Sequence, residues 1–245
     1  MLWQEEGIVL ATRRHGESSL VVNLLTPSHG RHAGLVRGGA GRKARPLYQV
    51  GNRLQAAWRA RLAEQLGSFS AELLVPTAAR IMDDPDRLAA LGSACALLQT
   101  TLPERDPHPR LYNRLAVFTD MLIENAGWLE GYVRFELALL ADLGFGLDLT
   151  ACAVTGGSED LAYVSPRTGR AVSRSAAAPY ASRLLPLPGF LVGDGAADLA
   201  QIGAGLHLTG AFLERHLFAP HDRSVPNARQ LLLDRLTRHT LSGKA

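Results

Sequence analysis

One run of this sequence, Gly38-Gly-Ala-Gly-Arg-Lys43, combines glycines with cations and so has the residue types that bind phosphate. A nucleotide-binding P-loop needs glycine and lysine side by side, then serine or threonine, then a helix. Here an arginine separates the glycine from the lysine, alanine follows, and Pro46 comes soon after. This mismatch argues against nucleotide hydrolysis. The loop fits contact with a phosphodiester backbone better, because glycine permits close approach while cations neutralise phosphate. The candidates for this contact are Arg37, Arg42, Lys43 and Arg45.

Other side chains that could act in catalysis have the spacing of structural residues. The sequence has no Gly-x-Ser-x-Gly nucleophile elbow. Cys95 lies in an apolar run, which is typical of a buried and unreactive thiol. The eight histidines are scattered, and those near the C-terminus lack the i, i+4 spacing of metal ligands on a helix. We therefore expect no catalytic residues, no cofactor and no enzymatic activity.

Charge is distributed unevenly along the 245 residues, although the whole chain carries only +3. Residues 1–80 have a net charge of +6, and residues 81–149 have one of −6. Within residues 31–61 there are eight basic residues and no acidic residue. A basic segment of this kind suggests contact with a polyanion, most simply nucleic acid. The alternatives are a solvated charged face or a basic face that docks an acidic protein partner.

The elements that would position these cations are short strands. Aliphatic runs at 7–13, 20–26, 31–37 and 52–62 are separated by turn signals. The last run alternates, which places Trp58 and Leu62 on a core face together with Leu54, Ala56 and Ala60. Its other face carries a basic stripe that joins the candidate DNA contacts: Arg53, Arg59 and Arg61. With Trp58 inside, Tyr48 is the aromatic residue left to stack on bases. About five short strands in this length favour an OB-fold barrel.

From residue 81 the apolar residues follow a helical period. Asp84 and Pro85 predict a capped helix that runs to about residue 102, and further helices are expected from about 110 to 127 and from 128 to 144. Glycine and proline interrupt this pattern over residues 150–180. The predicted fold is α+β: an OB-fold domain at 1–80, a helical domain in two parts at 81–149 and 181–245, and a small loop-rich insert at 150–180.

Composition sets the expected compartment. The chain is 47% hydrophobic and 20% charged, as in ordinary globular proteins, and it has only two cysteines. The N-terminus is acidic, and no apolar run approaches the ~20 residues of a membrane span. We expect a cytoplasmic protein that uses no membrane.

Several landmarks, in order along nearly the whole chain, resemble the bacterial RecO family of DNA repair proteins. In the first part these are Gly7-Ile-Val-Leu, Gly16-Glu-Ser-Ser19, His29-Gly-Arg31 and Val36-Arg-Gly38. In the second part they are the run from Arg134 to Gly144, then Leu147-Asp-Leu149 and Cys152. The resemblance implies an OB-fold, a helical domain and often a small zinc module. It also implies a recombination mediator that binds single- and double-stranded DNA, anneals complementary strands, and works with RecR to load RecA on strands coated by single-strand-binding protein (SSB). The implied location is the cytoplasm, in association with the nucleoid.

The sequence departs from the family at the zinc module. Members that hold zinc use two Cys-x-x-Cys pairs, whereas here the first pair reads Cys152-Ala-Val-Thr155 and the second falls at Ser173 to Ala176 without cysteine. A tetrahedral zinc site cannot be built from one thiolate. We expect a degenerate module without metal, held by packing of Leu161, Tyr163 and Val172.

Arg134 opens the family-like helical run and is a cation on an otherwise acidic and apolar segment. A guanidinium beside an apolar groove can hold a terminal carboxylate through paired hydrogen bonds. We expect Arg134 to bind an acidic partner segment, the C-terminal tail of SSB. The alternative is a neighbour of Glu130 or Glu136 on a solvated helix face. The rival functions for the whole chain are a protein-interaction module with an acidic partner and, third, a hydrolase or nucleotidyl transferase.

Overall fold

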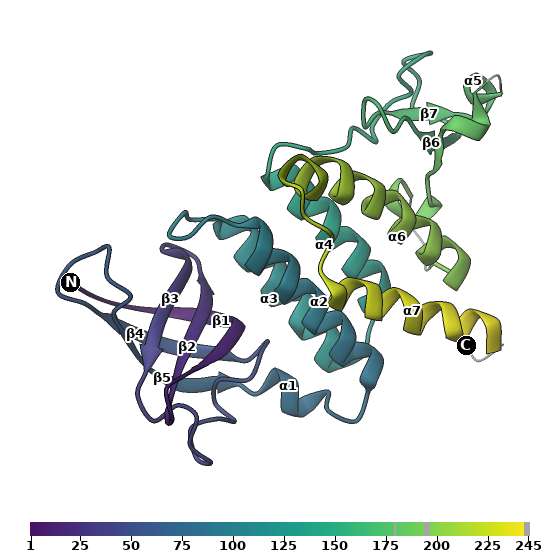
Figure 1. The fold of residues 1–245 in the computed structure, drawn as a ribbon. Coiled ribbons are helices and arrows are strands. Elements are labelled where there is room, and N and C mark those ends of the chain that lie inside the picture. The colour runs from purple at the N-terminus through teal and green to yellow at the C-terminus, as the bar shows by residue number, and fades with distance from the viewer. Residues whose placement is uncertain (179, 194–196, 243–245) are drawn as a thin grey trace. The chain divides into compact units, whose positions relative to one another are not determined.

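The computed structural model describes residues 1–178, 180–193 and 197–242, and their arrangement is shown in Figure 1. The described residues form two compact units. The first unit contains residues 1–125 and 226–232, and the second contains 126–225 and the residues from 233 onward. No helix in the described part of the chain is long and apolar enough to cross a membrane.

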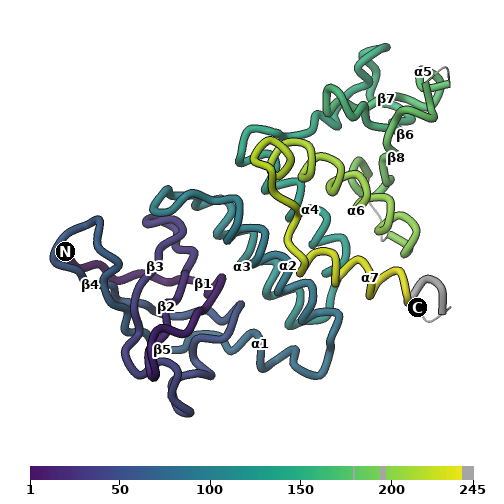
Figure 2. Tube along the Cα trace, viewed as in Figure 1, coloured from purple at the N-terminus to yellow at the C-terminus, as the bar shows by residue number. Residues whose placement is uncertain are grey.

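A closed five-stranded barrel opens the first unit, as the OB-fold prediction requires. Its strands are β1 (Leu2–His15), β2 (Ser19–Thr26), β3 (Gly30–Val36), β4 (Arg53–Arg59) and β5 (Ser68–Val75). They follow one another around the barrel in the order β1-β2-β3-β5-β4, with β1 pairing both β2 and β4 (Figures 1 and 2). The α+β fold class is therefore confirmed: a barrel first, then helices.

Strand β4 shows why the alternation predicted the barrel and at which residue that prediction fails. Leu54, Ala56 and Trp58 point into the barrel core and are almost fully buried, because successive side chains of a strand face opposite sides. The strand stops at Arg59, and residues 60–67 turn away as a loop. Leu62, expected on the core face, is therefore 55% exposed, and that expectation was wrong.

Three helices complete the first unit: α1 (Thr77–Arg80), α2 (Pro85–Thr101) and α3 (Pro109–Glu124). The predicted start of α2 is confirmed, since the Asp84 carboxylate accepts hydrogen bonds from the backbone N–H groups of Asp86 and Arg87. α2 and α3 belong to the same compact unit as the barrel, so this division of the chain differs from one that begins a helical domain at residue 81.

The second unit is built around α4 (Trp128–Asp142) and α6 (Leu199–Leu213), which pack on each other. Between them the buried Glu136 carboxylate accepts a hydrogen bond from Thr209. α6 continues into a π-helical turn at Glu214–Phe218 and a 3-10 turn at Ala219–His221. The last helix, α7 (Asn227–Ser242), begins in the first unit and ends in the second.

The insert between α4 and α6 is a small sheet with its own apolar cluster. Its strands are β6 (Leu161–Val164), β7 (Ala171–Ser173) and β8 (Leu185–Pro186), in the order β7-β6-β8. The short helix α5 (Arg174–Ala177) follows β7, and 3-10 turns lie at Ala181–Arg183 and Gly189–Leu191. Cys152, Val172 and Ala177 form the buried cluster, against which Leu161 and Tyr163 pack. The expected packing residues are thus where the sequence placed them.

Candidate nucleic-acid interface

The long connection from β3 to β4 carries the predicted basic loop on a fixed base. The Asn52 amide donates to the carbonyl oxygens of Pro46 (3.0 Å) and Leu47 (3.1 Å), and its oxygen accepts from the backbone of Ala78 (3.3 Å). Nearer the start of the connection, the backbone N–H of Ala40 donates to the carbonyl of Ser18 in the β1–β2 turn. These bonds attach both the start and the end of the connection to the barrel.

The loop cations are solvent-exposed, as DNA contact requires. All four are exposed, and within the described residues none forms an ion pair with a carboxylate: Arg37, Arg42, Lys43 and Arg45. Because no carboxylate of the described residues pairs with them, the loop presents an uncompensated positive surface there. Such a surface attracts phosphate by Coulomb attraction and counterion release.

Tyr48 does not serve as the stacking residue that the sequence suggested. Its side chain is only 5% exposed, because it belongs to the barrel core with Val36 and Leu54. A ring covered on both faces cannot stack on a base. That expectation was wrong, and Tyr48 instead anchors the loop.

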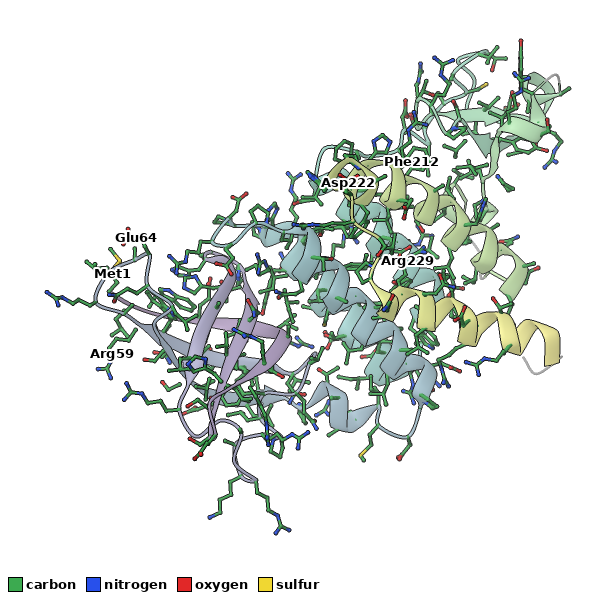
Figure 3. All side chains as sticks on the ribbon, in the orientation of Figure 1. Met1, Arg59, Glu64, Phe212, Asp222 and Arg229 are labelled. Carbon is green, nitrogen blue, oxygen red and sulfur yellow. The ribbon has the colours of Figure 1, made fainter. Side chains whose placement is uncertain are left out.

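The arginines of the β4 face divide into two groups. Arg59 and Arg61 are exposed, and Figure 3 shows Arg59 at the end of the barrel that carries Met1. Arg53 forms an ion pair with Asp120 of α3, and its side chain is only 15% exposed. Its guanidinium is therefore already engaged inside the first unit. We therefore do not propose Arg53 as a DNA contact.

Strand pairing brings the two groups of exposed cations near each other. Arg59 pairs with Ser68 of β5, and Ser68 pairs with Leu35 near the end of β3, two residues before Arg37. Neighbouring strands lie about 4.8 Å apart, so the backbones of Arg59 and Leu35 are about 10 Å apart. One DNA backbone can therefore touch both groups.

Two further cations stand next to the loop and were missed by the sequence reasoning. Arg13 and Arg14 are exposed at the end of β1, opposite Val21 and Leu20, beside the turn to which Ala40 is bonded. The signal was present as Arg13-Arg14-His15 directly before Gly16. These arginines lie outside the acid-free segment of residues 31–61, so the composition of that segment does not reveal them.

Arg134 lies on α4, is exposed, and contacts one residue across the second unit. Its guanidinium donates a hydrogen bond to the backbone carbonyl of Phe190 and lies 5.6 Å from the centre of that ring. Glu130 accepts a hydrogen bond from the backbone N–H of Ala197, and Glu136 is buried. The bond to Phe190 uses one terminal nitrogen of the Arg134 guanidinium, a group that carries five N–H donors in all.

The four positions of the degenerate zinc module do come together, but they do not fit zinc. The Cys152 sulfur accepts a hydrogen bond from the Ser173 backbone at 3.2 Å. Hydrogen bonds from Ser173 and Thr155 lower the pKa of Cys152 to about 6. Ala176 packs on the same cluster. One thiolate with two hydroxyls and a methyl group cannot supply four zinc ligands, and no group of three metal-binding side chains occurs among the described residues.

Comparison with known proteins covers nearly the whole chain. Residues 1–76 match the family model described as "Recombination protein O N terminal", and residues 82–225 match "Recombination protein O C terminal". A DNA repair protein RecO of Rhodospirillum centenum is 52% identical over 246 residues, covering 99% of this chain and 98% of the relative. The RecO of Rhodospirillum rubrum is 50% identical over 243 residues, covering 96% of each chain. That of a Jannaschia species is 51% identical over 246 residues, covering 99% of each.

Proposed function

The chain belongs to the RecO family of DNA repair proteins, and we propose that it acts as a recombination mediator without enzymatic activity of its own. In this proposal the barrel binds single- and double-stranded DNA and anneals complementary strands. With RecR, the protein assists RecA loading on strands coated by SSB. It works in the cytoplasm, at the nucleoid.

The observation that carries the proposal is the anchored basic loop. Its cations are exposed and unpaired in the described part of the chain, while bonds from Asn52 and Ala40 hold the loop in place. Cations on a held loop lose little conformational freedom when phosphate arrives, so more of the electrostatic attraction appears as affinity. The proposed DNA surface consists of Arg37, Arg42, Lys43, Arg45, Arg59 and Arg61.

Annealing is consistent with contacts of this kind. Phosphate contacts carry no base information, so the edges of the bases stay available to a complementary strand. Cations also screen the repulsion between two phosphate backbones. A protein that grips backbones without reading bases can therefore bring two complementary strands together.

The second unit supplies the proposed contact with SSB. Arg134 lies beside the aromatic ring of Phe190, and a peptide that ends in an apolar residue would place its terminal carboxylate on the guanidinium. This contact would bring the barrel to DNA that SSB already covers. RecR is proposed as a partner without a face assigned to it.

The experiment that tests the proposal is an annealing assay between complementary oligonucleotides, resolved by electrophoresis, with bare strands and with SSB-coated strands. We expect the protein to accelerate annealing in both cases. If the protein binds no oligonucleotide and accelerates nothing, the proposal is wrong. Binding of an acidic protein in place of DNA would then support the rival interaction module, and metal-dependent turnover would support an enzyme.

A further inference from the structure

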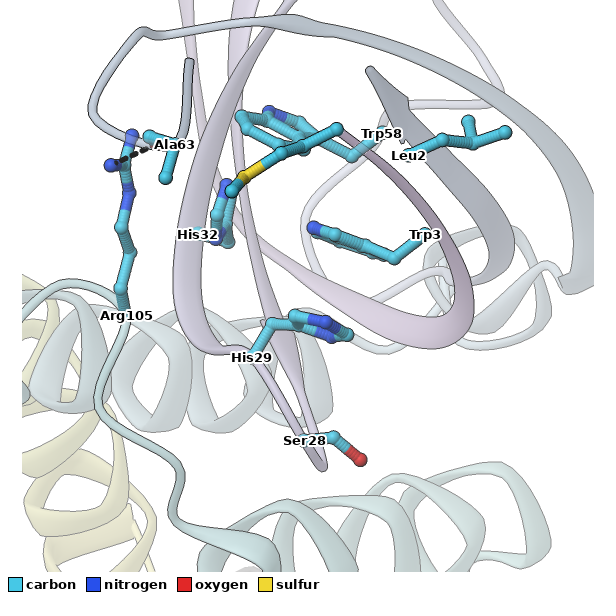
Figure 4. A pocket seen from close by; sticks show the side chains of 9 residues that line it. Leu2, Trp3, Ser28, His29, His32, Trp58, Ala63 and Arg105 are labelled. Atoms are coloured by element: carbon cyan, nitrogen blue, oxygen red, sulfur yellow. Dashed lines mark hydrogen bonds between the residues drawn. The ribbon is translucent and has the colours of Figure 1, made fainter. Parts of the chain in front are cut away.

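The barrel has a pocket at the end that carries the N-terminus. Its volume is about 420 Å³, within the roughly 300–1,000 Å³ of small-molecule sites. The lining comes from the start of β1, the β2–β3 turn, β3, the end of β4, the loop that follows it, and the connection between α2 and α3 (Figure 4). The polar and aromatic side chains among them are Trp3, His29, His32, Trp58 and Arg105.

Three rings form a near-parallel stack along one wall. The ring centre of Trp3 lies 4.2 Å from that of His29, with an angle of 10° between the planes. It lies 6.0 Å from the ring centre of Trp58, with an angle of 18°. Trp3 and Trp58 are directly opposed in the pairing of β1 with β4, so the barrel itself sets their relation. His29 is held by a 2.9 Å contact with the carboxylate of Glu5. Figure 4 shows Trp3 between His29 and Trp58.

His32 is buried, polar and without a hydrogen-bond partner. Its side chain is 4% exposed, it lines the pocket, and neither ring nitrogen has a partner within the described residues. The ring stands nearly perpendicular to both Trp3 (85°) and Trp58 (77°). Leaving such groups unpaired is costly, which points to a ligand that pairs with them. A neutral imidazole offers one donor and one acceptor.

Arg105 closes the pocket from the loop side. Its guanidinium donates to the carbonyl oxygens of Ala63 and Gln65, which ties the loop after β4 over the barrel end. Its own backbone has a φ of +62°, a left-handed conformation that costs energy for a non-glycine residue. Its charge and the burial of His32 keep that imidazole neutral at physiological pH.

We propose that this pocket receives one unstacked base of single-stranded DNA, and this inference rests on the proposed DNA-binding function. The base would displace the partly exposed His29 ring from the face of Trp3 that it covers, stack there, and present its edge to His32, whose ring stands perpendicular to that of Trp3. The side chain of Met1, 69% exposed, would move aside. Base stacking on aromatic rings is the usual way in which proteins hold single strands without regard to sequence.

The hydrogen-bonding groups of the pocket favour a base over the carboxylate of an acidic peptide. The neutral His32 offers one donor and one acceptor, and a carboxylate, which only accepts, would leave the acceptor nitrogen unpaired. Arg59 follows Trp58 in β4, and Arg61 lies in the adjoining loop, so phosphates on either side of the base would meet exposed cations.

The experiment compares two twelve-nucleotide probes that carry the same phosphates, oligo-dT and its abasic counterpart. The protein carries Trp128→Phe, which leaves Trp3 and Trp58 as the fluorescent residues of the three tryptophans. We expect oligo-dT to quench this fluorescence and to bind about tenfold more tightly than the abasic strand, at the lower end of the range for stacked bases. His32→Leu should reduce this preference several-fold. His207→Leu, an exposed histidine of the second unit, is the matched control.

Failures of this inference and of the proposed function are distinguishable. If both probes bind equally and neither quenches, DNA binding stands and the base pocket is wrong. If neither probe binds, the proposed function fails as well. An acidic peptide that quenches when oligo-dT does not would assign the pocket to a protein partner and overturn the inference. The quenching test uses protein in which His32 is intact, so it remains valid even if the His32 variant does not fold. His29→Ala provides a second variant at a partly exposed position.

Discussion

Arg53 and Arg59 stand six residues apart on one face of β4, yet only Arg59 is free to meet a phosphate. We predict that Arg59→Ala makes the salt dependence of single-strand binding shallower by about 0.7, the value for one lost phosphate contact. Arg53→Ala should leave that slope unchanged and lower the free energy of unfolding by about 1 kcal/mol, because it removes the pair with Asp120. Salt titrations and urea unfolding of both variants measure this. An equal loss of slope in the two variants would contradict it.

His32 predicts a pH dependence of stability. Burial, the charge of Arg105 and His29 lower its pKa from 6.5 to about 4 in the folded protein. The unfolded chain therefore binds the proton first as the pH falls, and stability is lost between about pH 6.5 and pH 4. Between pH 7 and pH 5, the free energy of unfolding should fall by about 2 kcal/mol less in His32→Leu than in the parent protein. Urea unfolding at both pH values tests this, with His207→Leu as control. The same pH dependence in all three proteins would contradict it.

Arg134 makes a separate prediction about the partner. Replacing it with alanine should lower the affinity for an acidic peptide that ends like the SSB tail by about tenfold, because charge-assisted hydrogen bonds to the carboxylate are lost. Arg134→Lys should recover only part of the affinity, since lysine lacks the paired donors. Calorimetric titration measures the effect, and Arg167→Ala, an exposed arginine in the insert, controls for charge. Unchanged affinity in Arg134→Ala would refute the role.

At the scale of elements, the insert has an apolar cluster in the region where the family resemblance implies a zinc module. Cys152 occupies one of the four ligand positions, Val172 and Ala177 adjoin two others, and Leu161 and Tyr163 pack around this cluster. We propose that burial of these apolar groups stabilises the sheet without metal coordination.

We accordingly predict less than one tenth of a zinc per chain in protein purified without chelator. A chelator should leave the thermal midpoint unchanged, because there is no metal to remove. Elemental analysis and thermal unfolding with and without chelator measure the two quantities. Stoichiometric zinc that survives dialysis would overturn the account of the insert.

The elements were predictable from the sequence where local patterns decide the structure. Alternation in β4 and the Asp84-Pro85 start of α2 depend on neighbouring residues, and both are confirmed. Strand β5 escaped notice because it has no clean alternation and exposes Leu73 and Leu74. Burial of Tyr48 was not predictable, since it depends on how the β3–β4 connection folds back on the barrel core.

Candidate site residues were predictable as a set but not one by one. The acid-free segment identified the loop cations, all exposed, from composition alone. The pairing of Arg53 with Asp120 joins residues 67 positions apart, and no local pattern announces it. The aromatic pocket gathers Trp3, His29 and Trp58 from three separate segments. Such sites exist only once the barrel has closed.

For the whole molecule, we propose that DNA binds to the first unit and a protein partner to the second. The basic loop, Arg59 and Arg61 are on the barrel, whereas Arg134 and Phe190 belong to the second unit. Variants of the two surfaces should therefore separate the two activities. Loss of DNA affinity should follow the barrel cations alone.

The measurement that tests this central claim most directly is a salt titration of single-stranded homopolymer binding. It uses the parent protein, the loop variant Arg42→Ala/Lys43→Ala/Arg45→Ala, and a charge-matched control, Arg167→Ala/Arg183→Ala/Arg223→Ala, at exposed positions of the second unit. For three to six phosphate contacts, the parent slope should lie between about −2 and −4. The slope of the loop variant should be shallower than that of the parent by about 2, and its affinity should be lower. The control should match the parent in both. A loop variant that equals the parent in affinity and slope, or a parent that binds no DNA at low salt, would contradict the account.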